Sequence, residues 1–201
     1  MNAPLGVILA GGLATRMGGG DKALLPLGQG TLLSHVVDRL APQVAGMALN
    51  ANGDPERFAA FGLPVLADSI DGFVGPLAGV LAGMDWAVEQ GAETIVSAAA
   101  DTPFFPTDLV ARLQEAAVGM ENPLVLSRTE DGRQPTFGLW PVALRDDLRA
   151  ALNGGLRKVV MWTDAHGGRE AMFPDATPAP FFNVNTPEDL ELAQGYLEGA
   201  A

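Results

Sequence analysis

The stretch "LGVILAGGLATRMGGGDKALL", residues 5–25, decides the fold because it joins a buried strand to a long glycine-rich segment. Residues 5–10 are short, unbroken and apolar, and two glycines follow them, a pattern typical of a strand inside a parallel sheet. The segment after the strand carries Arg16 and Lys22. Ligands of open α/β sheets usually bind in the crevice at the carboxyl ends of the strands. The stretch therefore predicts an anion-binding loop at that edge.

The rest of the chain alternates between strand and helix patterns. Further strands are predicted at 44–50, 63–68, 94–101, 122–127 and 134–140, and helices at 31–43, 76–91, 106–119, 141–155, 155–168 and from 187 onward. Thr186 is the predicted cap of the last helix, and residues 173–180, rich in proline, form a predicted surface loop. This order predicts an α/β fold with a mostly parallel, doubly wound sheet.

Composition limits the classes of function. The 201 residues suit a single domain, 1–201, and the net charge of −12 disfavours binding to nucleic acid or to an anionic membrane. The chain has no cysteine, which excludes disulfides and thiolate sites, and its two histidines are too few for a histidine-rich metal site. No apolar stretch approaches the roughly 18 residues of a membrane span. We therefore expect a cytoplasmic protein and a monomer.

The glycine-rich segment matches neither of the two best-known phosphate loops. Lys22 is followed by Ala23 and is not preceded by glycine, so the Walker pattern fails. The letters "GGGDKA", 18–23, satisfy the dinucleotide pattern, but that motif must begin where the strand ends, well upstream of Gly18. A different loop is needed, in which glycines bring backbone N–H groups close to an anion and two cations assist.

The stretch L-A-G-G-x-A-x-R-M-G-G-x-D-K, residues 9–22, resembles the nucleotidyltransferases with a Rossmann-like fold, and most closely the molybdenum cofactor guanylyltransferases of the MobA type. Five further motifs occur in that family's order: "LNANGD" (49–54), "LADS" (66–69), "GPLAGVLAGM" (75–84), "AADTPF" (99–104) and "NVNTPEDL" (183–190). The resemblance implies a three-layer α/β fold. It also implies transfer of GMP from GTP to Mo-molybdopterin with Mg²⁺, or Mn²⁺, as cofactor.

Asp101 is the predicted metal ligand. It follows the strand at 94–100, so its carboxylate should emerge at the same sheet edge as the glycine-rich segment, and Mg²⁺ is commonly held by one or two carboxylates plus substrate phosphates. From the residues alone, a turn-forming aspartate is the simpler interpretation, and the resemblance favours the metal role. Asp21 is interpreted as orienting Lys22.

The resemblance assigns the remaining roles residue by residue. It makes Arg16, Lys22 and Asp101 catalytic, and it gives GTP binding to Leu9, Ala10, Gly11, Gly12, Lys22, Asn50, Asp68 and Asp101. The N-terminal half would then hold GTP and the metal, and the C-terminal half the acceptor. Acceptor candidates are Arg133, Gln134, Thr136, Arg157, Lys158, Asn183 and Asn185. Other cofactor-biosynthesis proteins or molybdoenzyme chaperones are expected partners.

Three alternatives remain open. One is transfer of CMP or another nucleotide to a pterin. Relatives that transfer CMP commonly have L-A-A-G where this chain has L-A-G-G at 9–12, which favours GTP. Transfer to a sugar phosphate is a second, although the usual G-x-G-T-R loop of those enzymes is missing here. The third is a non-catalytic GTP-binding module, which would not need the carboxylate of Asp101.

Overall fold

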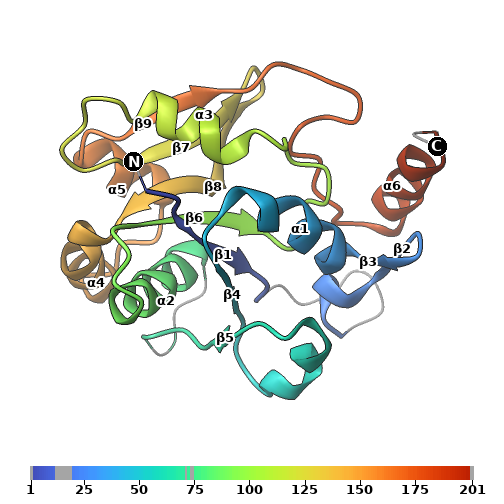
Figure 1. The fold of residues 1–201 in the computed structure, drawn as a ribbon, viewed down its shortest axis with the longest axis horizontal. Helices are drawn as coiled ribbons and strands as arrows, with labels where there is room; N and C mark the ends of the chain where they lie inside the picture. The colour runs from blue at the N-terminus through green and yellow to red at the C-terminus, as the bar shows by residue number, and fades with distance from the viewer. Residues whose placement is uncertain (1, 12–19, 71, 73–74, 200–201) are drawn as a thin grey trace.

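A computed structural model of the protein describes residues 2–11, 20–70, 72 and 75–199. Its main feature is a seven-stranded sheet in the order β5-β4-β1-β6-β8-β7-β9 (Figure 1). The strands of this sheet are β1 Leu5–Leu9, β4 Met47–Asn50, β5 Val65–Leu66, β6 Thr94–Ala99, β7 Val125–Thr129, β8 Gly132–Pro141 and β9 Arg169–Met172.

Strands from both halves of the chain share this sheet. Neighbours pair in parallel from β5 through β4 and β1 to β6, and again between β7 and β9. Strand β8 runs antiparallel to both of its neighbours, β6 and β7. The prediction of a mostly parallel sheet is confirmed. A separate hairpin of β2 Pro26–Leu27 and β3 Gly30–Thr31, and the strand β9, lie where the apolar patterning predicted none.

Helices cover both faces of the sheet and make three layers (Figure 1). They are α1 Leu32–Leu40, α2 Pro76–Glu89, α3 Leu109–Ala116, α4 Arg145–Asn153, α5 Val159–Ala165 and α6 Pro187–Gly199, with 3-10 turns η1 Lys22–Leu24, η2 Ala41–Gln43, η3 Pro55–Phe61 and η4 Val142–Leu144. The predicted helices at 106–119 and 155–168 are shorter than expected. Within the described ranges, no helix is long and apolar enough to span a membrane.

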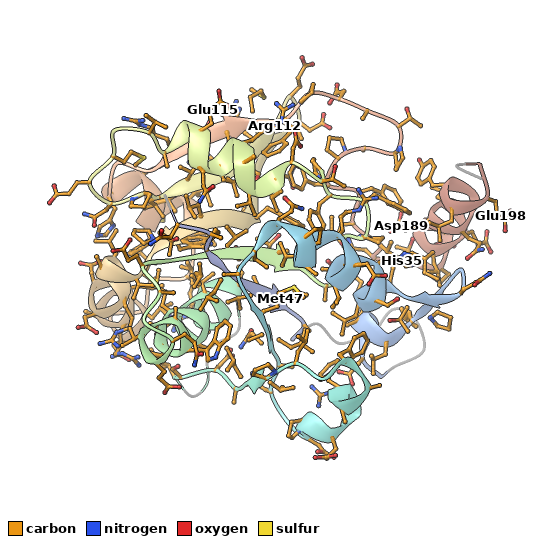
Figure 2. All side chains as sticks on the ribbon, viewed as in Figure 1. His35, Met47, Arg112, Glu115, Asp189 and Glu198 are labelled. Atoms are coloured by element: carbon orange, nitrogen blue, oxygen red, sulfur yellow. The ribbon has the colours of Figure 1, made fainter. Side chains whose placement is uncertain are left out.

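The core is divided by the sheet into two clusters. Ile8 of β1 packs with α1 and α3 on one face, and Val7 packs with α2, α4 and α5 on the other, as the period-two alternation of a strand requires. Met47, near the centre of the view in Figure 2, packs against the first cluster. A third, smaller cluster joins α6 to the β2–β3 hairpin and contains Val184.

Helix α6 begins with the predicted cap. Asp189 N–H donates to Thr186 Oγ1 at 3.2 Å, and Thr186 N–H donates back to Asp189 Oδ2 at 2.9 Å. Pro187 occupies the first helical position, where its missing N–H costs nothing. This reciprocal cap fixes where the segment before the helix, residues 183–185, enters it.

Candidate active site

Four strands end side by side at one edge of the sheet. Leu9 pairs with Asn50 on one side and with Ala99 on the other, and Asn50 pairs in turn with Leu66. All four strands run in the same direction, so the segments that leave them emerge together. Most of the predicted nucleotide residues lie in these four strands or within two residues of their ends: Leu9, Ala10, Gly11, Asn50, Asp68 and Asp101. This makes the edge the candidate site.

A lysine and an aspartate form the centre of one end of the site. Lys22 lies in η1 and is 8% exposed, and its Nζ donates to Asp101 Oδ2 at 2.6 Å. The same Nζ donates to Asn185 Oδ1 at 2.6 Å and to Asn183 Oδ1 at 3.3 Å. An ammonium has three N–H donors, and here three side-chain oxygens accept them. The structure thus gathers Asp101 and both predicted asparagines around Lys22.

The backbone explains why the asparagines lie there. Val184 N–H donates to the carbonyl of Asp101 at 2.9 Å, and the Val184 side chain is fully buried. In an extended segment the residues on either side of a buried one point the opposite way, which turns both asparagines toward Lys22. Asn185 N–H donates to Asp189 Oδ2 at 2.8 Å, and this bond, with those of Thr186, holds the pKa of the Asp189 carboxyl below its usual value.

Two predicted GTP-binding residues also reach this end of the site: Leu9, the last residue of β1, and Ala10, which follows it. A small cavity of about 20 Å³ is lined by Leu9, Ala10, Lys22, Ala23, Ala100 and Asp101. A Cβ atom at Gly11 would meet no atom of the described residues within 4 Å, so space is open beside the backbone at this position. An incoming ligand can therefore approach the chain closely at this position.

The other end of the site is built around Asp68. Asn50 Nδ2 donates to Asp68 Oδ1 at 2.9 Å, and Asn52 Nδ2 donates to Asp68 Oδ2 at 2.9 Å. Asp68 N–H donates back to Asn52 Oδ1 at 2.9 Å. Both oxygens of the carboxylate are thereby fixed in direction, and each keeps a lone pair for a further donor.

Helix α2 presses directly on Asn50. A Cβ at Gly79 would lie 2.1 Å from Asn50 Oδ1 and 2.7 Å from Leu9 Cδ2, so only glycine fits at this point of the helix. Asn50 is 6% exposed and also donates to the carbonyl of Leu66 at 3.2 Å. Its amide is therefore held on three sides. The "GPLAG" motif contributes close packing rather than a polar group.

A guanidinium connects the two ends of the site. Arg57, in η3, donates from Nη2 to the carbonyl of Asn52 at 2.6 Å, and its Nε lies 2.9 Å from Asp21 Oδ2 in an ion pair. Asp21 directly precedes Lys22 in the chain. The interpretation of Asp21 as the residue that orients Lys22 is corrected: its carboxylate faces Arg57, and Lys22 bonds to other oxygens.

Comparison with known proteins identifies the family. The model of the MobA-like NTP transferase domain matches residues 6–167. A molybdenum cofactor guanylyltransferase of Rhodopseudomonas palustris (strain HaA2) is 52% identical over 196 residues, which cover 96% of this chain and 92% of the relative. The chain belongs to the molybdenum cofactor guanylyltransferase family. That family consists of nucleotidyltransferases, as the sequence motifs predicted.

Solved structures share the fold of this guanylyltransferase family member. Molybdopterin-guanine dinucleotide biosynthesis protein A from Archaeoglobus fulgidus has a TM-score of 0.74 at 21% identity, over 97% of this chain and 99% of that chain. A Mycobacterium tuberculosis H37Rv protein in complex with manganese has a TM-score of 0.68 at 20% identity, over 96% and 99%. The Rossmann-like fold class is confirmed.

Other residues predicted for the guanylyltransferase site have different surroundings. Gly12 and Arg16 lie outside the described residues. Gln134 Nε2 lies 3.4 Å from Thr129 Oγ1, and Thr136 is half-buried in the part of β8 beyond its pairing with β6. Arg157 donates to the carbonyls of Leu152 and Leu156, and Lys158 is exposed at the start of α5.

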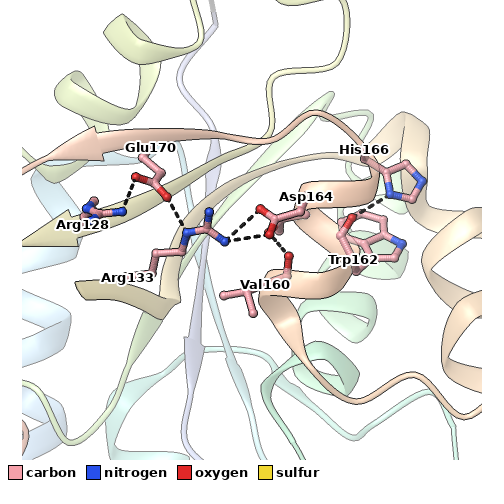
Figure 3. Close-up of polar contacts among 8 residues, drawn as sticks. Arg128, Arg133, Val160, Trp162, Asp164, His166 and Glu170 are labelled. Carbon is pink, nitrogen blue, oxygen red and sulfur yellow. Dashed lines mark hydrogen bonds and ion pairs between the residues drawn. The ribbon is translucent and has the colours of Figure 1, made fainter.

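Arg133 is bound into a group of ion pairs at β8, β9 and α5 (Figure 3). Its Nη1 donates to Asp164 at 2.8 Å, and its Nε donates to Glu170, which also accepts from Arg128 at 2.8 Å. The hydrogen bond from Arg133, followed by that from Arg128, keeps the pKa of the Glu170 carboxyl below its usual value. The guanidinium of Arg133 thus has two carboxylates as partners within the protein itself.

The donor atoms near Asp101 suit a hard divalent cation. Among the residues that the structure describes, no three His, Cys, Asp or Glu side chains gather as a metal site. A single carboxylate with substrate phosphate oxygens and water is a common environment for Mg²⁺. Asp101 fits that role, because its Oδ2 already accepts from a cationic group and its side chain is 22% exposed.

Three residues that contact the candidate site were missed by sequence reasoning. Asn52 and Arg57 lie in or just after the "LNANGD" motif, and Gly79 lies in "GPLAG". A signal for Asn52 was present, because it lies two residues after Asn50 where the strand is ending and can face the same side. The roles of Arg57 and Gly79 depend on contacts with distant parts of the chain, which no local pattern reveals.

Proposed function

We propose that this chain transfers GMP from GTP to the terminal phosphate of Mo-molybdopterin, forming the guanine dinucleotide and pyrophosphate. The observation that supports this most is the spacing of the two ends of the site. Asp101 follows β6 and Asp68 follows β5, three strand spacings away in the sheet, or about 14 Å at roughly 4.8 Å per strand. A nucleoside triphosphate can bridge that separation, with its base at Asp68 and its phosphates at Lys22.

Asp68 would select guanine through the direction of hydrogen bonds. The guanine edge carries two neighbouring donors, the ring N1–H and the 2-amino group, and a carboxylate accepts both in a bidentate manner. Cytosine and adenine present a ring-nitrogen acceptor in the corresponding place, which would face the carboxylate without a hydrogen bond. A site built for one pattern of donors rejects a ligand that leaves its polar groups unpaired.

The chemistry needs positioning and charge compensation rather than a nucleophile from the protein. An oxygen of the acceptor phosphate attacks the α-phosphorus of GTP, the bond to the oxygen that bridges to the β-phosphate breaks, and pyrophosphate leaves. Lys22, with Arg16 and the backbone of residues 9–12, would hold the triphosphate in line. Mg²⁺, with Mn²⁺ as an alternative, would be held by Asp101 and would supply charge neutralisation at the leaving pyrophosphate.

The acceptor would bind on the side of the site formed by the second half of the chain. Proposed contacts are Arg133, Gln134, Thr136, Asn183 and Asn185. Of these, the two asparagines already face Lys22. We further propose that residues 1–201 act as one domain, as a monomer in the cytoplasm, and that the product is passed to other cofactor-biosynthesis proteins or molybdoenzyme chaperones.

Pyrophosphate release tests the proposal. Purified protein is incubated with Mg²⁺, Mo-molybdopterin and each of the four NTPs in turn, and pyrophosphate is measured together with the dinucleotide product. Release that requires metal and acceptor, and that is fastest with GTP, is expected. Faster reaction with CTP would indicate a CMP transferase. Tight GTP binding by the wild-type protein without any release of pyrophosphate would indicate a non-catalytic GTP-binding module.

A further inference from the structure

Three side-chain oxygens from distant parts of the chain converge on one positive charge. Asp101 Oδ2 and Asn185 Oδ1 each lie 2.6 Å from Lys22 Nζ, and Asn183 Oδ1 lies 3.3 Å from it. An ammonium carries donors only, so both amides must present their oxygens to it. Carboxylate and amide oxygens are also the protein ligands that divalent cations such as Mn²⁺ and Mg²⁺ accept.

These hydrogen bonds are incompatible with simultaneous binding of a triphosphate by Lys22, the role that the proposed function gives to this residue. All three of its donors are in use, so an ammonium held as the structure shows has none left for a phosphate oxygen. A metal ion and an ammonium also cannot occupy the same place beside Asp101. To contact a phosphate oxygen, Lys22 Nζ has to release at least one of these three oxygens, and a carboxylate that it releases would repel phosphate unless another cation took its place.

We propose that Asp101, Asn185 and Asn183 together form the divalent-cation site, and that Lys22 Nζ occupies the metal position in the metal-free protein and competes with the metal ion for it. This proposal rests on the proposed function for its nucleotide but adds two metal-site residues and an exchange of cations. Asn185 is the second ligand, because its oxygen is as close to the ammonium as that of Asp101. Asn183, at the longer distance, is a weaker or water-mediated ligand.

The backbone around Asn185 is anchored, which keeps its side chain in a fixed position beside Lys22. Its backbone N–H is fixed by Asp189, the neighbouring Val184 is buried and bonded to the backbone of Asp101, and the Asn185 side chain is exposed toward the site. A side chain anchored from behind can exchange one cation for another without loss of its position.

Binding of Mn²⁺ alone, followed by the electron paramagnetic resonance signal of the free ion, tests the proposal without any turnover. Asn185→Ala should weaken Mn²⁺ binding by at least about ten-fold, the lower end of what loss of a supporting group at a metal site costs. Asn185→Asp should strengthen binding, because it adds a carboxylate to the same place. Asp101→Asn should abolish it.

Lys22→Met gives the sharpest test, because it is expected to raise the affinity for Mn²⁺, whereas Asn185→Ala and Asp101→Asn are expected to lower it. Removing an ammonium from the metal position should raise the affinity of the nucleotide-free protein for Mn²⁺ by about ten-fold or more. If Lys22 only binds phosphate elsewhere, the same variant would leave that affinity unchanged. The matched control for the amide variants is Gln114→Ala, because the Gln114 amide donates to the carbonyl of Asn2 at 3.1 Å, and this variant should leave Mn²⁺ binding as in the wild type.

The outcomes separate this proposal from the proposed function. Unchanged Mn²⁺ affinity in Asn185→Ala, with a raised KM for Mo-molybdopterin, would overturn the metal role and assign Asn185 to the acceptor alone. Unchanged Mn²⁺ affinity in Lys22→Met would overturn the exchange. The substitutions at Asn185, Asp101 and Lys22 could change Mn²⁺ affinity as expected while the wild type releases no pyrophosphate from GTP. In that case the proposed function fails and the cation site stands. Circular dichroism and thermal melting confirm that each variant is folded.

Discussion

Each end of the site contains one aspartate and two asparagines, but the asparagine amides face in opposite directions at the two ends. At one end Asp68 is flanked by Asn50 and Asn52, and at the other Asp101 is flanked by Asn183 and Asn185. Around Asp68 the amides donate their N–H groups to the carboxylate. Around Asp101 they turn their oxygens toward a cation. An aspartate with two asparagines is therefore neither a base site nor a metal site until its hydrogen-bond directions are known.

Lys22 accounts for the difference. Near Asp68, the amide N–H groups are the partners that satisfy the carboxylate, so under the proposed function this end is already arranged to receive a neutral base with donors of its own. Near Asp101, the ammonium balances the carboxylate, so under the proposed cation exchange Lys22 gives way to a metal ion before this end can bind phosphate. The proposals thus make the Asp68 end preorganised and the Asp101 end dependent on a rearrangement. Four substitutions can break or sharpen that contrast, in order of expected effect.

Lys22→Ala should have the largest effect on turnover. Removing the cation proposed to contact the triphosphate should lower the rate of pyrophosphate release by about 10²–10³-fold, the scale seen when one charge-stabilising donor of an active site is deleted. Among the described residues, the side-chain partners of Lys22 are Asp101, Asn183 and Asn185 and not the residues around Asp68, so preference for GTP over CTP should survive in the residual activity. Arg169→Ala is the matched control, since that exposed guanidinium bonds to the carbonyls of Ala116 and Val118. Near-normal turnover in a folded Lys22→Ala protein would remove the lysine from the mechanism.

Asp68→Asn should act on the choice of base rather than on the rate. An amide can accept only one of guanine's two donors, and loss of a hydrogen bond to a charged group costs about 1.5–3 kcal/mol, so GTP affinity should fall by roughly 10–100-fold. Competition titrations with CTP provide the measurement. The exposed loop aspartate gives the control Asp175→Asn. Equal losses for GTP and CTP would show that Asp68 does not read the base edge.

Most of the fold could be predicted from sequence, because it depends on short-range patterns. An apolar run predicts the strand that ends at Leu9, and the glycines after it mark where that strand ends. A proline marks the start of α2. The hairpin β2–β3 and the strand β9 could not be predicted in the same way. Two-residue strands have no periodicity, and β9 contributes one fully buried side chain, Ala171.

The site was predictable where a polar residue ends a strand and unpredictable where its partner is distant. Asn50, Asp68 and Asp101 could be placed at one edge because parallel strands end together. Asn185 could not be placed beside Lys22, since 163 positions separate them in sequence and no local pattern describes that contact. The orientation of the asparagine amide groups is even harder to predict from sequence, because it depends on whether a carboxylate or an ammonium faces them.

Gly79→Ala should disturb the base end alone. The added methyl would overlap Asn50 Oδ1, and overpacking of this kind costs about 1–3 kcal/mol of stability. Gly83→Ala is the matched control on the same helix, where a Cβ would lie 2.5 Å from Val7 Cγ2 and far from any polar group of the site. Both variants should melt earlier, but only Gly79→Ala should lose GTP affinity, by a few-fold. A Gly79→Ala protein that keeps full affinity would show that Asn50 can shift without cost to the base.

The smallest effect is expected at Arg133, and it tests whether this arginine belongs to the site. Its bonds to Asp164 and Glu170 are partly exposed, and such pairs contribute about 0.2–1 kcal/mol each. If they are the whole role of Arg133, Arg133→Ala should lower the free energy of unfolding by that amount and leave the KM for Mo-molybdopterin unchanged. A raised KM at unchanged stability would instead support the sequence-based assignment to the acceptor.

The pH dependence of that loss gives a second, independent check. Arg133 lowers the pKa of Glu170 in the folded protein below its ordinary value of 4.5. A carboxyl with a lowered folded pKa contributes stability above its unfolded pKa and loses it as the pH falls through the folded pKa. The difference in unfolding free energy between wild type and Arg133→Ala should therefore be constant near neutral pH and shrink below about 4.5. A difference that persists undiminished into strong acid would mean that Arg133 stabilises the fold through the packing of its side chain and not through its ion pairs with Glu170 and Asp164.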